Sequence, residues 1–442
     1  MSFAPEQAGR ELLELIERLY PVCRSLTGDG VRETLRVLGE VAPIEVHEVP
    51  SGTPVLDWTV PDEWNVRDAY VADADGVRVV DFQRSNLHLV GYSAPFRGTL
   101  TLEELRPHLH SLPDQPSRVP YRTSYYDRNW GFCVAHAVLE RMGPGPYEVV
   151  VDTELGPGSL TYGELVVPGE GQEELLLTAH VCHPSLANDN LSGLAIAVHL
   201  ARELARRPRR TGVRILLAPG TIGSITWLAR NQERLARIRC GLSMVCLGDG
   251  ASLTYKRSYG GRSVLDAVAE RLLRARRESG REPEAEVIDF FPYGYDERQF
   301  NAPAFRIPFG SLMRGRHGTF PEYHTSGDDV EFLDPERLGA SLQFLLELVE
   351  AVDAAPRYRS RAPAGEPQLG RRGLYRAIGG DDGARGLELA MLWILSMGEG
   401  SETLPSVASR SGLDPALVER AAALLREHQL IEWPFEGRSS TP

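Results

Sequence analysis

The segment 178–193 holds the densest group of side chains able to bind a metal ion. It contains two histidines and an Asn-Asp-Asn run, and it follows an apolar run that is typical of a buried strand. His180 lies where this strand is expected to end, and Asp189 lies just before a helix expected from Ser192. Imidazole nitrogens and carboxylate oxygens together suit zinc. The alternative is that Asp189 or Asn190 only caps the helix.

Two further candidate ligands follow later apolar runs. Asp249 ends one such run within Leu-Gly-Asp-Gly, and His324 comes after another strand and before a long helix. Each also has an ordinary explanation as a residue of a turn. Because parallel sheets gather ligands at the carboxyl ends of their strands, we expect both residues to converge with His180 and Asp189 on one metal site.

Alternating strands and helices are expected to position these residues. The expected strands are 175–178, 213–217, 242–247, 287–291 and 305–307, and the expected helices are 192–204, 222–228, 264–273 and 335–352. This alternation predicts a mainly parallel sheet that is covered on both faces. Residues 58–110 carry short β-type runs separated by Asp-Gly turns, which indicates a small inserted β-rich module.

The C-terminal part differs in composition. Residues 356–385 are rich in Arg, Pro and Gly, as is typical of a linker. Residues 386–442 have winged-helix character, with two amphipathic segments separated by a turn at Gly412. Between 386 and 434, three basic and seven acidic residues leave a net charge of about −4. A phosphate backbone needs cationic partners, so we expect no specific nucleic-acid binding and instead a packing or homo-oligomer-forming role.

The composition of the whole chain excludes several classes of protein. Its 442 residues are 42% hydrophobic and 25% charged, as in ordinary globular proteins. There is no run of 18 apolar residues and no basic start followed by an apolar stretch, so neither a membrane span nor a secretory signal is expected. The five cysteines form no CxxC pair, which fits a reducing compartment and predicts a cytoplasmic location.

The order of the four candidate ligands resembles that of the co-catalytic zinc aminopeptidases. Asp189 lies within Asn-Asp-Asn-x-Ser-Gly, and His324 lies within His-Thr-Ser. A closer resemblance is to a bacterial family with an aminopeptidase-like domain, a small inserted domain and a C-terminal winged helix. Further matching segments are 20–28, 121–126, 130–133, 296–299 and 322–325.

This resemblance implies both a fold and a function. The fold is a three-layer α/β aminopeptidase-like domain of the phosphorylase/hydrolase type, with a mostly parallel mixed sheet, in residues 1–57 and 111–355. His180 and Asp249 would bind one zinc ion, Asp189 would bridge two, and His324 would bind the second. Such a site polarises an amide carbonyl. The implied substrate is a small aminoacyl or peptide-like molecule, in a biosynthetic pathway, and the number of zinc ions stays open between one and two.

Two positions depart from the pattern of the family. Cys182 stands where the wider clan has a carboxylate that orients the first histidine, and Gly220 stands where closer relatives have a glutamate. Losing a general base costs about 10²–10⁴-fold in rate. We therefore expect Glu297, Asp296 or Glu322 to serve as the catalytic carboxylate, or the protein to have lost hydrolysis.

Three residues are candidates for substrate binding. Arg298 can pair with a substrate carboxylate or with a neighbouring acidic residue. His183 can act as an extra metal ligand or a substrate contact, or it can form hydrogen bonds within its own loop. Tyr323 lies in the matching segment around the last histidine. The leading interpretation is a zinc-dependent amidohydrolase or aminopeptidase. The alternatives are a metal-binding pseudo-peptidase and a winged-helix regulator.

Overall fold

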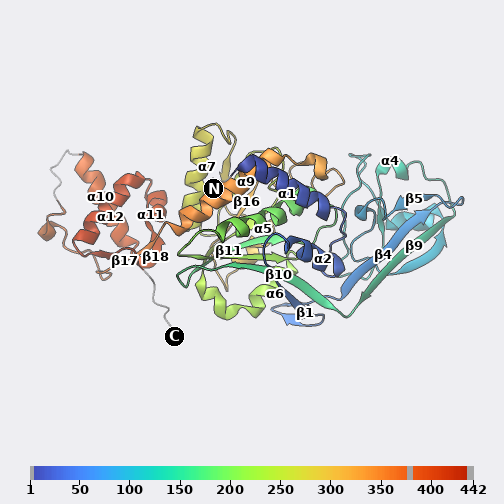
Figure 1. The fold of residues 1–442 in the computed structure, drawn as a ribbon, viewed down its shortest axis with the longest axis horizontal. Coiled ribbons are helices and arrows are strands. Elements are labelled where there is room, and N and C mark those ends of the chain that lie inside the picture. Colours follow the sequence, from blue (N-terminus) through green and yellow to red (C-terminus); the bar gives the residue numbers. More distant parts are fainter. Residues whose placement is uncertain (1–3, 376–381, 436–442) are drawn as a thin grey trace.

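The protein has three parts, which follow one another along its longest axis in the computed structural model (Figure 1). A β-rich module lies at one end, an α/β domain in the middle and a smaller helical part at the other end. The structure describes residues 4–375 and 382–435. Residues 376–381 of the expected linker and 436–442 of the expected winged helix lie outside these described ranges.

The central domain is built on an eight-stranded mixed sheet with the order β1-β10-β12-β11-β13-β16-β14-β15. Its strands are β1 (Glu45–Pro50), β10 (Ser159–Val167), β11 (Glu174–His180), β12 (Gly212–Ala218), β13 (Ile238–Met244), β14 (Thr254–Lys256), β15 (Glu286–Ile288) and β16 (Phe309–Met313). β11 pairs in parallel with both β12 and β13, and β13 pairs in parallel with β16. The loops that follow these four strands therefore lie at one edge of the sheet.

Helices cover both faces of this sheet. They are α1 (Pro5–Leu19), α2 (Asp29–Leu38), α5 (Gly193–Leu204), α6 (Ile222–Arg230), α7 (Val264–Glu278), α8 (Glu297–Phe300) and α9 (Pro335–Asp353). Leu175 and Leu177 of β11 pack into the core that holds α1, α5, α7 and α9, whereas Leu176 packs into a second core with Trp227 of α6. Successive side chains of a strand point to opposite faces, so one strand contributes to both cores. The predicted three-layer α/β fold is confirmed.

The observed strands differ from the expected ones at their ends; the strand expected at 287–291, for example, is β15, which ends at Ile288. The strand expected at 305–307 begins instead at Phe309, because Arg306 lies in a turn and has a φ of 47°. The strand expected at 242–247 ends at Met244, and Cys246 has a φ of 49°. The apolar runs continue past both turns because their side chains are buried there as well.

The β-rich module is larger than expected. Its sheet has the order β5-β4-β9-β6 and consists of β5 (Arg78–Asp81), β4 (Glu63–Ala72), β9 (Tyr147–Gly156) and β6 (Phe96–Leu100). Shorter elements are β2 (Pro54–Val55), β3 (Trp58–Thr59), β7 (Leu109–His110), β8 (Phe132–Cys133), α3 (Leu102–Leu105) and α4 (His136–Leu139). β9 lies outside the expected 58–110, yet it pairs with β4 from Glu63–Gly156 to Ala72–Glu148. The four-stranded sheet of the module therefore draws its strands from residues 63–156.

The C-terminal part is a small helical domain with a three-stranded sheet. Its elements are β17 (Arg357–Ser360), α10 (Asp382–Ser396), β18 (Glu399–Thr403), α11 (Leu404–Ser411), α12 (Pro415–Glu427) and β19 (Ile431–Glu432). β17 lies between β18 and β19, and Tyr358 is fully buried in the core of this domain. Part of the expected linker 356–385 is therefore a strand. Its alternation of Arg and Tyr is a strand pattern that the Arg, Pro and Gly content concealed.

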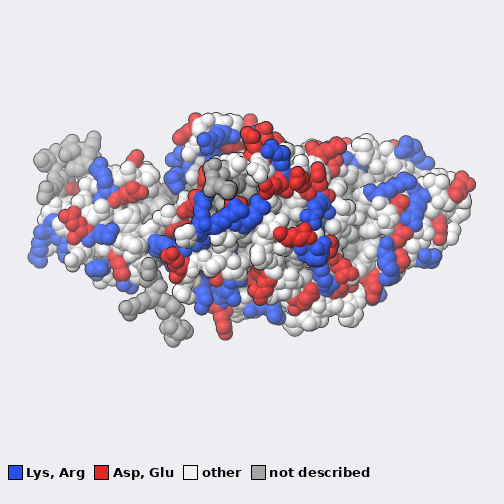
Figure 2. All heavy atoms as spheres, viewed as in Figure 1, with Lys and Arg blue, Asp and Glu red and all other residues white. Residues whose placement is uncertain are grey.

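Starting the C-terminal domain at residue 356 instead of 386 changes its net charge. From 356 to 434 the chain has ten arginines and ten acidic residues, so the formal charges cancel instead of leaving −4. Figure 2 shows positive and negative side chains interspersed over the visible face of this part and of the central domain. Within the described residues, no helix is long and apolar enough to cross a membrane.

Candidate metal centre

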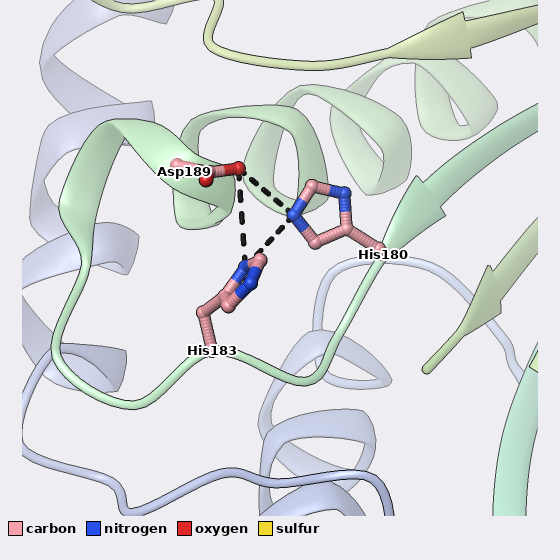
Figure 3. A group of neighbouring side chains, drawn as sticks. All are labelled: His180, His183 and Asp189. Carbon is pink, nitrogen blue, oxygen red and sulfur yellow. Dashed lines mark hydrogen bonds and ion pairs between the residues drawn. The ribbon is translucent and has the colours of Figure 1, made fainter. Parts of the chain in front are cut away.

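The loop that follows β11 brings two histidines and a carboxylate together (Figure 3). His180 is the last residue of β11, and its Nε2 lies 3.0 Å from His183 Nδ1 and 2.9 Å from Asp189 Oδ1. His183 Nδ1 lies 3.9 Å from the same oxygen. All three side chains are buried. Three potential ligand atoms thus lie within 4.8 Å of one another at the carboxyl edge of the sheet.

Hydrogen bonds from distant segments hold this loop in place. The Asp328 carboxylate accepts the backbone N–H groups of Asn188 and Asp189, the latter at 3.0 Å. Arg24, from the segment 20–28, donates its Nε–H to the carbonyl of His183 at 2.9 Å. Two distant stretches of the chain therefore hold the backbone of the loop that carries the ligand side chains.

The electrostatics of these residues suit a cation. Burial alone would raise the pKa of Asp189, but the imidazoles of His183 and His180 lower that pKa well below its usual range. Burial lowers the pKa of His183 well below its usual value, so this imidazole is neutral and has a free lone pair. Although His180 Nε2 is close, Asp189 Oδ1 accepts no well-oriented hydrogen bond from any residue that the structure describes. Buried anionic oxygens of this kind are stabilised by a bound metal.

The other oxygen of Asp189 lies in a different environment. Its Oδ2 accepts a hydrogen bond from the Tyr295 hydroxyl at 2.9 Å and lies 3.0 Å from His324 Nε2. The Tyr295 hydroxyl is also 2.9 Å from the Tyr323 hydroxyl, and the Tyr323 ring stacks on His324 with 4.0 Å between centroids. The structure thus brings His324 and Tyr323 to the predicted site, together with Tyr295, which was not predicted.

Gly220 faces this site from the loop that follows β12. A Cβ atom at Gly220 would lie 3.3 Å from His180 Cβ, 3.6 Å from Tyr295 Cδ1 and 3.7 Å from Asp296 Oδ1. The Tyr295 ring stacks on the His180 imidazole, with 4.2 Å between centroids and 13° between planes. Tyr295 therefore lies beside the space that a larger side chain at position 220 would enter.

Two of the three predicted catalytic carboxylates are engaged elsewhere. Glu297 forms an ion pair with Lys256 of β14, and both side chains are fully buried. Glu322 pairs with Arg118, with 2.6 Å between its Oε1 and the guanidinium. Both carboxylates are thus engaged in ion pairs that hold loops together.

Asp296 is the predicted carboxylate that lies next to the site. It is buried beside Gly220, and its Oδ1 accepts a hydrogen bond from Ser224 Oγ at 2.8 Å. Burial raises the pKa of Asp296 to about 6. The adjacent Arg298 is exposed to solvent on α8. Proton transfer near neutral pH is best served by a group with a pKa in this range.

Asp249 is buried in the loop that follows β13 and is extensively hydrogen-bonded. Its two oxygens accept backbone N–H groups from Ala251 at 2.8 Å and Gly315 at 2.9 Å, and Oδ2 also accepts the side-chain amide of Asn188 at 2.8 Å. These contacts tie together the loops after β13 and β16. The structure brings His180, Asp189 and His324 into contact, and the role of Asp249 as a ligand stays a prediction.

Sequence reasoning missed two more residues at this edge. Cys246 is buried in the loop after β13, where its backbone N–H donates to Asn190 Oδ1 at 3.3 Å, and burial and the Asp189 carboxylate raise the pKa of its thiol well above the usual value. His317 is buried, its ring contacts that of Tyr295, and its Nδ1 has no partner among the described residues. Both residues follow strands at the carboxyl edge, as His180 does, and this was the signal that could have identified them.

Two family models match the chain. Residues 13–355 match the family described as Domain of unknown function (DUF4910), and residues 356–433 match the winged helix-turn-helix family. A relative from Clostridium acetobutylicum, named "Putative polysaccharide biosynthesis protein with aminopeptidase-like domain", is 44% identical over 426 residues, which cover 96% of this chain and 97% of the relative.

Solved structures share the fold. A crystal structure described as a "putative peptidase" from Clostridium acetobutylicum is 42% identical, with a TM-score of 0.80 over 97% of each chain. A zinc aminopeptidase from Bacillus subtilis is 15% identical, with a TM-score of 0.54 over 80% of this chain and 98% of that one. The second likeness is one of fold alone.

Proposed function

This chain belongs to the DUF4910 family, and from this premise we propose that it is a metal-dependent, aminopeptidase-like amidohydrolase. The observation that carries the proposal is the convergence of His180, His183 and Asp189 at the carboxyl edge of the sheet, around a carboxylate oxygen without a hydrogen-bond donor among the described residues. The fold shared with zinc aminopeptidases supports it.

Zinc is the ion that these donors suit best. Two imidazoles and one carboxylate are a common ligand set of catalytic zinc sites. When bound, zinc supplies a Lewis acid that polarises an amide carbonyl. The low pKa values keep the His183 imidazole neutral and the Asp189 carboxylate ionised, as metal binding requires.

Asp296 is our choice for the proton acceptor. Glu297 and Glu322 are held by Lys256 and Arg118, whereas Asp296 lies beside the ligand His180 across Gly220. Its pKa of about 6 leaves its carboxylate mostly ionised at neutral pH. The hydroxyl groups of Tyr295 and Tyr323 line the opposite side of Asp189 and can orient a polar group of the substrate.

The proposed substrate is a small aminoacyl or peptide-like molecule with one reactive amide. The name of the Clostridium acetobutylicum relative connects that protein with polysaccharide biosynthesis, so we propose an amide in a biosynthetic intermediate, such as an acylated amino sugar. The exposed Arg298 is the proposed partner for a substrate carboxylate. A cytoplasmic location and assembly into homo-oligomers are part of the same proposal.

One observation favours a second candidate function. Gly220 carries no carboxylate, and the Tyr295 ring lies beside its place. A protein that keeps the metal ligands but has no competent proton acceptor would bind an amide without cleaving it. This pseudo-peptidase differs from the first proposal only in the chemical step.

The test uses full-length protein purified without chelators. Metal content is measured first, and hydrolysis is then assayed with aminoacyl anilides, dipeptides and N-acylated amino sugars. We expect bound zinc, weak cleavage of anilides and faster cleavage of at least one of the other classes. His180→Ala should abolish both metal and cleavage, and His136→Ala, in the β-rich module, should change neither. Bound zinc without cleavage of any amide would favour the pseudo-peptidase.

A further inference from the structure

We propose that Phe291 and Tyr293 form an aromatic platform on which the sugar ring of the substrate stacks, outside the metal centre. This inference rests on the function proposed above, from which it takes the substrate class, an N-acylated amino sugar. It concerns the part of the surface that recognises the sugar, whereas the metal centre acts on the amide.

The two rings of the platform are exposed side by side. Phe291 is 53% exposed and Tyr293 is 56% exposed, and their ring centroids lie 6.1 Å apart. Both residues belong to the loop between β15 and α8. Aromatic rings offer a large apolar area at a small cost in side-chain entropy, and neighbouring exposed rings are typical of a binding surface.

The anchor of this loop lies beneath the platform. Lys256 is buried, and its Nζ lies 5.7 Å from the centroid of the Phe291 ring and donates a hydrogen bond to the carbonyl of Tyr293 at 2.9 Å. Glu297 pairs with Lys256, and its Oε2 accepts the backbone N–H of Tyr295 at 3.0 Å. Because protein occupies the inner side of the platform, its exposed side faces solvent and is already in place to receive a ligand.

Ring contacts connect the platform with the proposed metal centre. The centroid of the Tyr293 ring lies 5.9 Å from that of His317, which lies 5.7 Å from that of Tyr295. The Tyr295 ring in turn stacks on His180. Within this row, His317 Nδ1 has no hydrogen-bond partner among the described residues, so the row is not a saturated part of the core. The platform is therefore the exposed end of a row of rings that starts at a proposed metal ligand.

The exposure of the platform favours a sugar ring over an aliphatic side chain. An aliphatic group gains most in an enclosed apolar pocket, because the hydrophobic effect grows with the area removed from water. A pyranose ring has a face of C–H groups that can stack on an aromatic ring, and hydroxyl groups at its edge that stay hydrated. Half-exposed rings suit both parts. The Tyr293 hydroxyl and the exposed Asp289 of the same loop offer hydrogen-bond partners for the sugar hydroxyls.

The test is ligand binding to the full-length protein, measured by saturation-transfer NMR. The probes are the methyl glycoside of N-acetylglucosamine and N-acetyl-leucine amide, which has no sugar ring. Phe291→Ala and Tyr293→Ala should each weaken binding of the sugar about 3–10-fold, as expected for one lost ring contact, and leave binding of the aliphatic amide unchanged. Tyr293→Phe keeps the ring and should bind the sugar like wild type. Tyr375→Ala, at an equally exposed tyrosine of the C-terminal domain, is the matched control.

Three results would overturn the platform. They are absence of sugar binding in wild type, equal sugar binding in wild type and both alanine variants, and equal weakening of both probes, which would mean that the loop acts on the whole site. Tighter binding of uridine than of the sugar would assign the rings to a nucleobase instead. The wild-type spectra decide the matter even without the variants: saturation should be largest at the ring C–H protons, and saturation confined to the acetyl group would contradict stacking.

Failure of the platform and failure of the proposed function can be told apart. Metal content and amide cleavage are measured on the same samples. Sugar binding that depends on Tyr293, without bound metal or cleavage, would overturn the metal-dependent function and leave the platform intact. Cleavage by a metal-loaded protein whose sugar binding ignores both rings would overturn the platform alone.

Discussion

The loops that follow β11 and β12 lie side by side at one edge of the sheet, but only the first carries side chains that can bind a metal ion. The two strands are parallel neighbours, with His180 paired to Ala218. After β11 come two histidines and an aspartate that converge, and after β12 comes Gly220, whose missing side chain is replaced by Tyr295 from another loop. The comparison teaches that the carboxyl end of a parallel strand is a favourable place for a functional side chain. Whether such a side chain is present there, and what contacts that place, can depend on a loop far away in the sequence.

The loop that follows β13 adds a third case. It carries a carboxylate, Asp249, at the same edge, but that carboxylate accepts hydrogen bonds from Ala251, Gly315 and Asn188. The Asp249 carboxylate therefore ties its own loop to the loop after β16 and to the segment that holds Asn188.

The largest expected effect tests the loop after β11. Asp189→Asn keeps the size of the side chain but removes the negative charge that both histidines face. We expect loss of bound metal and a fall in hydrolysis of about 10²–10⁴-fold, as for other lost catalytic groups. Metal analysis and steady-state kinetics measure both. Asp152→Asn, on the exposed part of β9, is the matched control, and an unchanged metal content in Asp189→Asn would remove this loop from the site.

The next effect concerns the anchor of the loop that lies beside Gly220. Glu297→Gln leaves the buried Lys256 without its counter-charge, which typically costs about 3–5 kcal/mol of stability. Urea unfolding measures the change. Combined replacement by Lys256→Met and Glu297→Leu should recover most of the loss, because no unpaired charge then remains buried. Equal losses in the single and double variants would show that the pair is not the anchor.

A smaller effect, on the pH dependence of stability, is expected for Asp296, which lies beside Gly220. Its pKa is about 6 in the folded chain and 3.8 ordinarily, so the folded state holds the proton more tightly. Wild type therefore loses stability at this residue as the pH rises from about 4 to 6, and Asp296→Asn does not. The stability of the variant relative to wild type should increase by about 1–3 kcal/mol across this range and then stay constant. Urea unfolding of metal-free protein checks this, and a flat difference would contradict it.

The smallest effect is expected in the C-terminal domain, away from all three loops. Its positive and negative charges balance, so we expect only weak DNA binding that salt abolishes. A mobility-shift titration at low salt and at about 150 mM salt measures this. Tight binding that survives the higher salt would mean that the central domain does not act alone, and the winged-helix regulator would become the better interpretation.

The residues of the loop after β11 could be predicted from the sequence better than the surroundings of Gly220 after β12. His180, Asp189 and His324 could be found because ligand residue types follow apolar runs, and His183 was recognised as a possible extra ligand from the same loop. Asp249 satisfied the same rule, but the donors that occupy it come from Gly315 and Asn188, and no local pattern reports such distant partners.

Tyr295 shows why the rest could not be predicted. It precedes Asp296 in a recognised segment, but only the three-dimensional structure shows that its ring lies on His180, beside Gly220. The fold has a similar example in β9, whose partner β4 lies more than seventy residues earlier and whose register depends on that pairing. The spacing of residues along the sequence indicates local geometry, whereas the Tyr295–His180 contact and the β4–β9 pairing join residues far apart in the chain.

The Lys256–Glu297 pair divides the site into two separately supported halves. His180, His183 and Asp189 are held by β11 and by Asp328, whereas the loop with Tyr295 is held from β14. Apart from Tyr295, which contacts His180 and Asp189, residues of that loop can be replaced without removing the support of the proposed metal ligands. For protein engineering, this makes the loop an exchangeable part: new substrate preferences can be selected there while the metal-binding half stays constant.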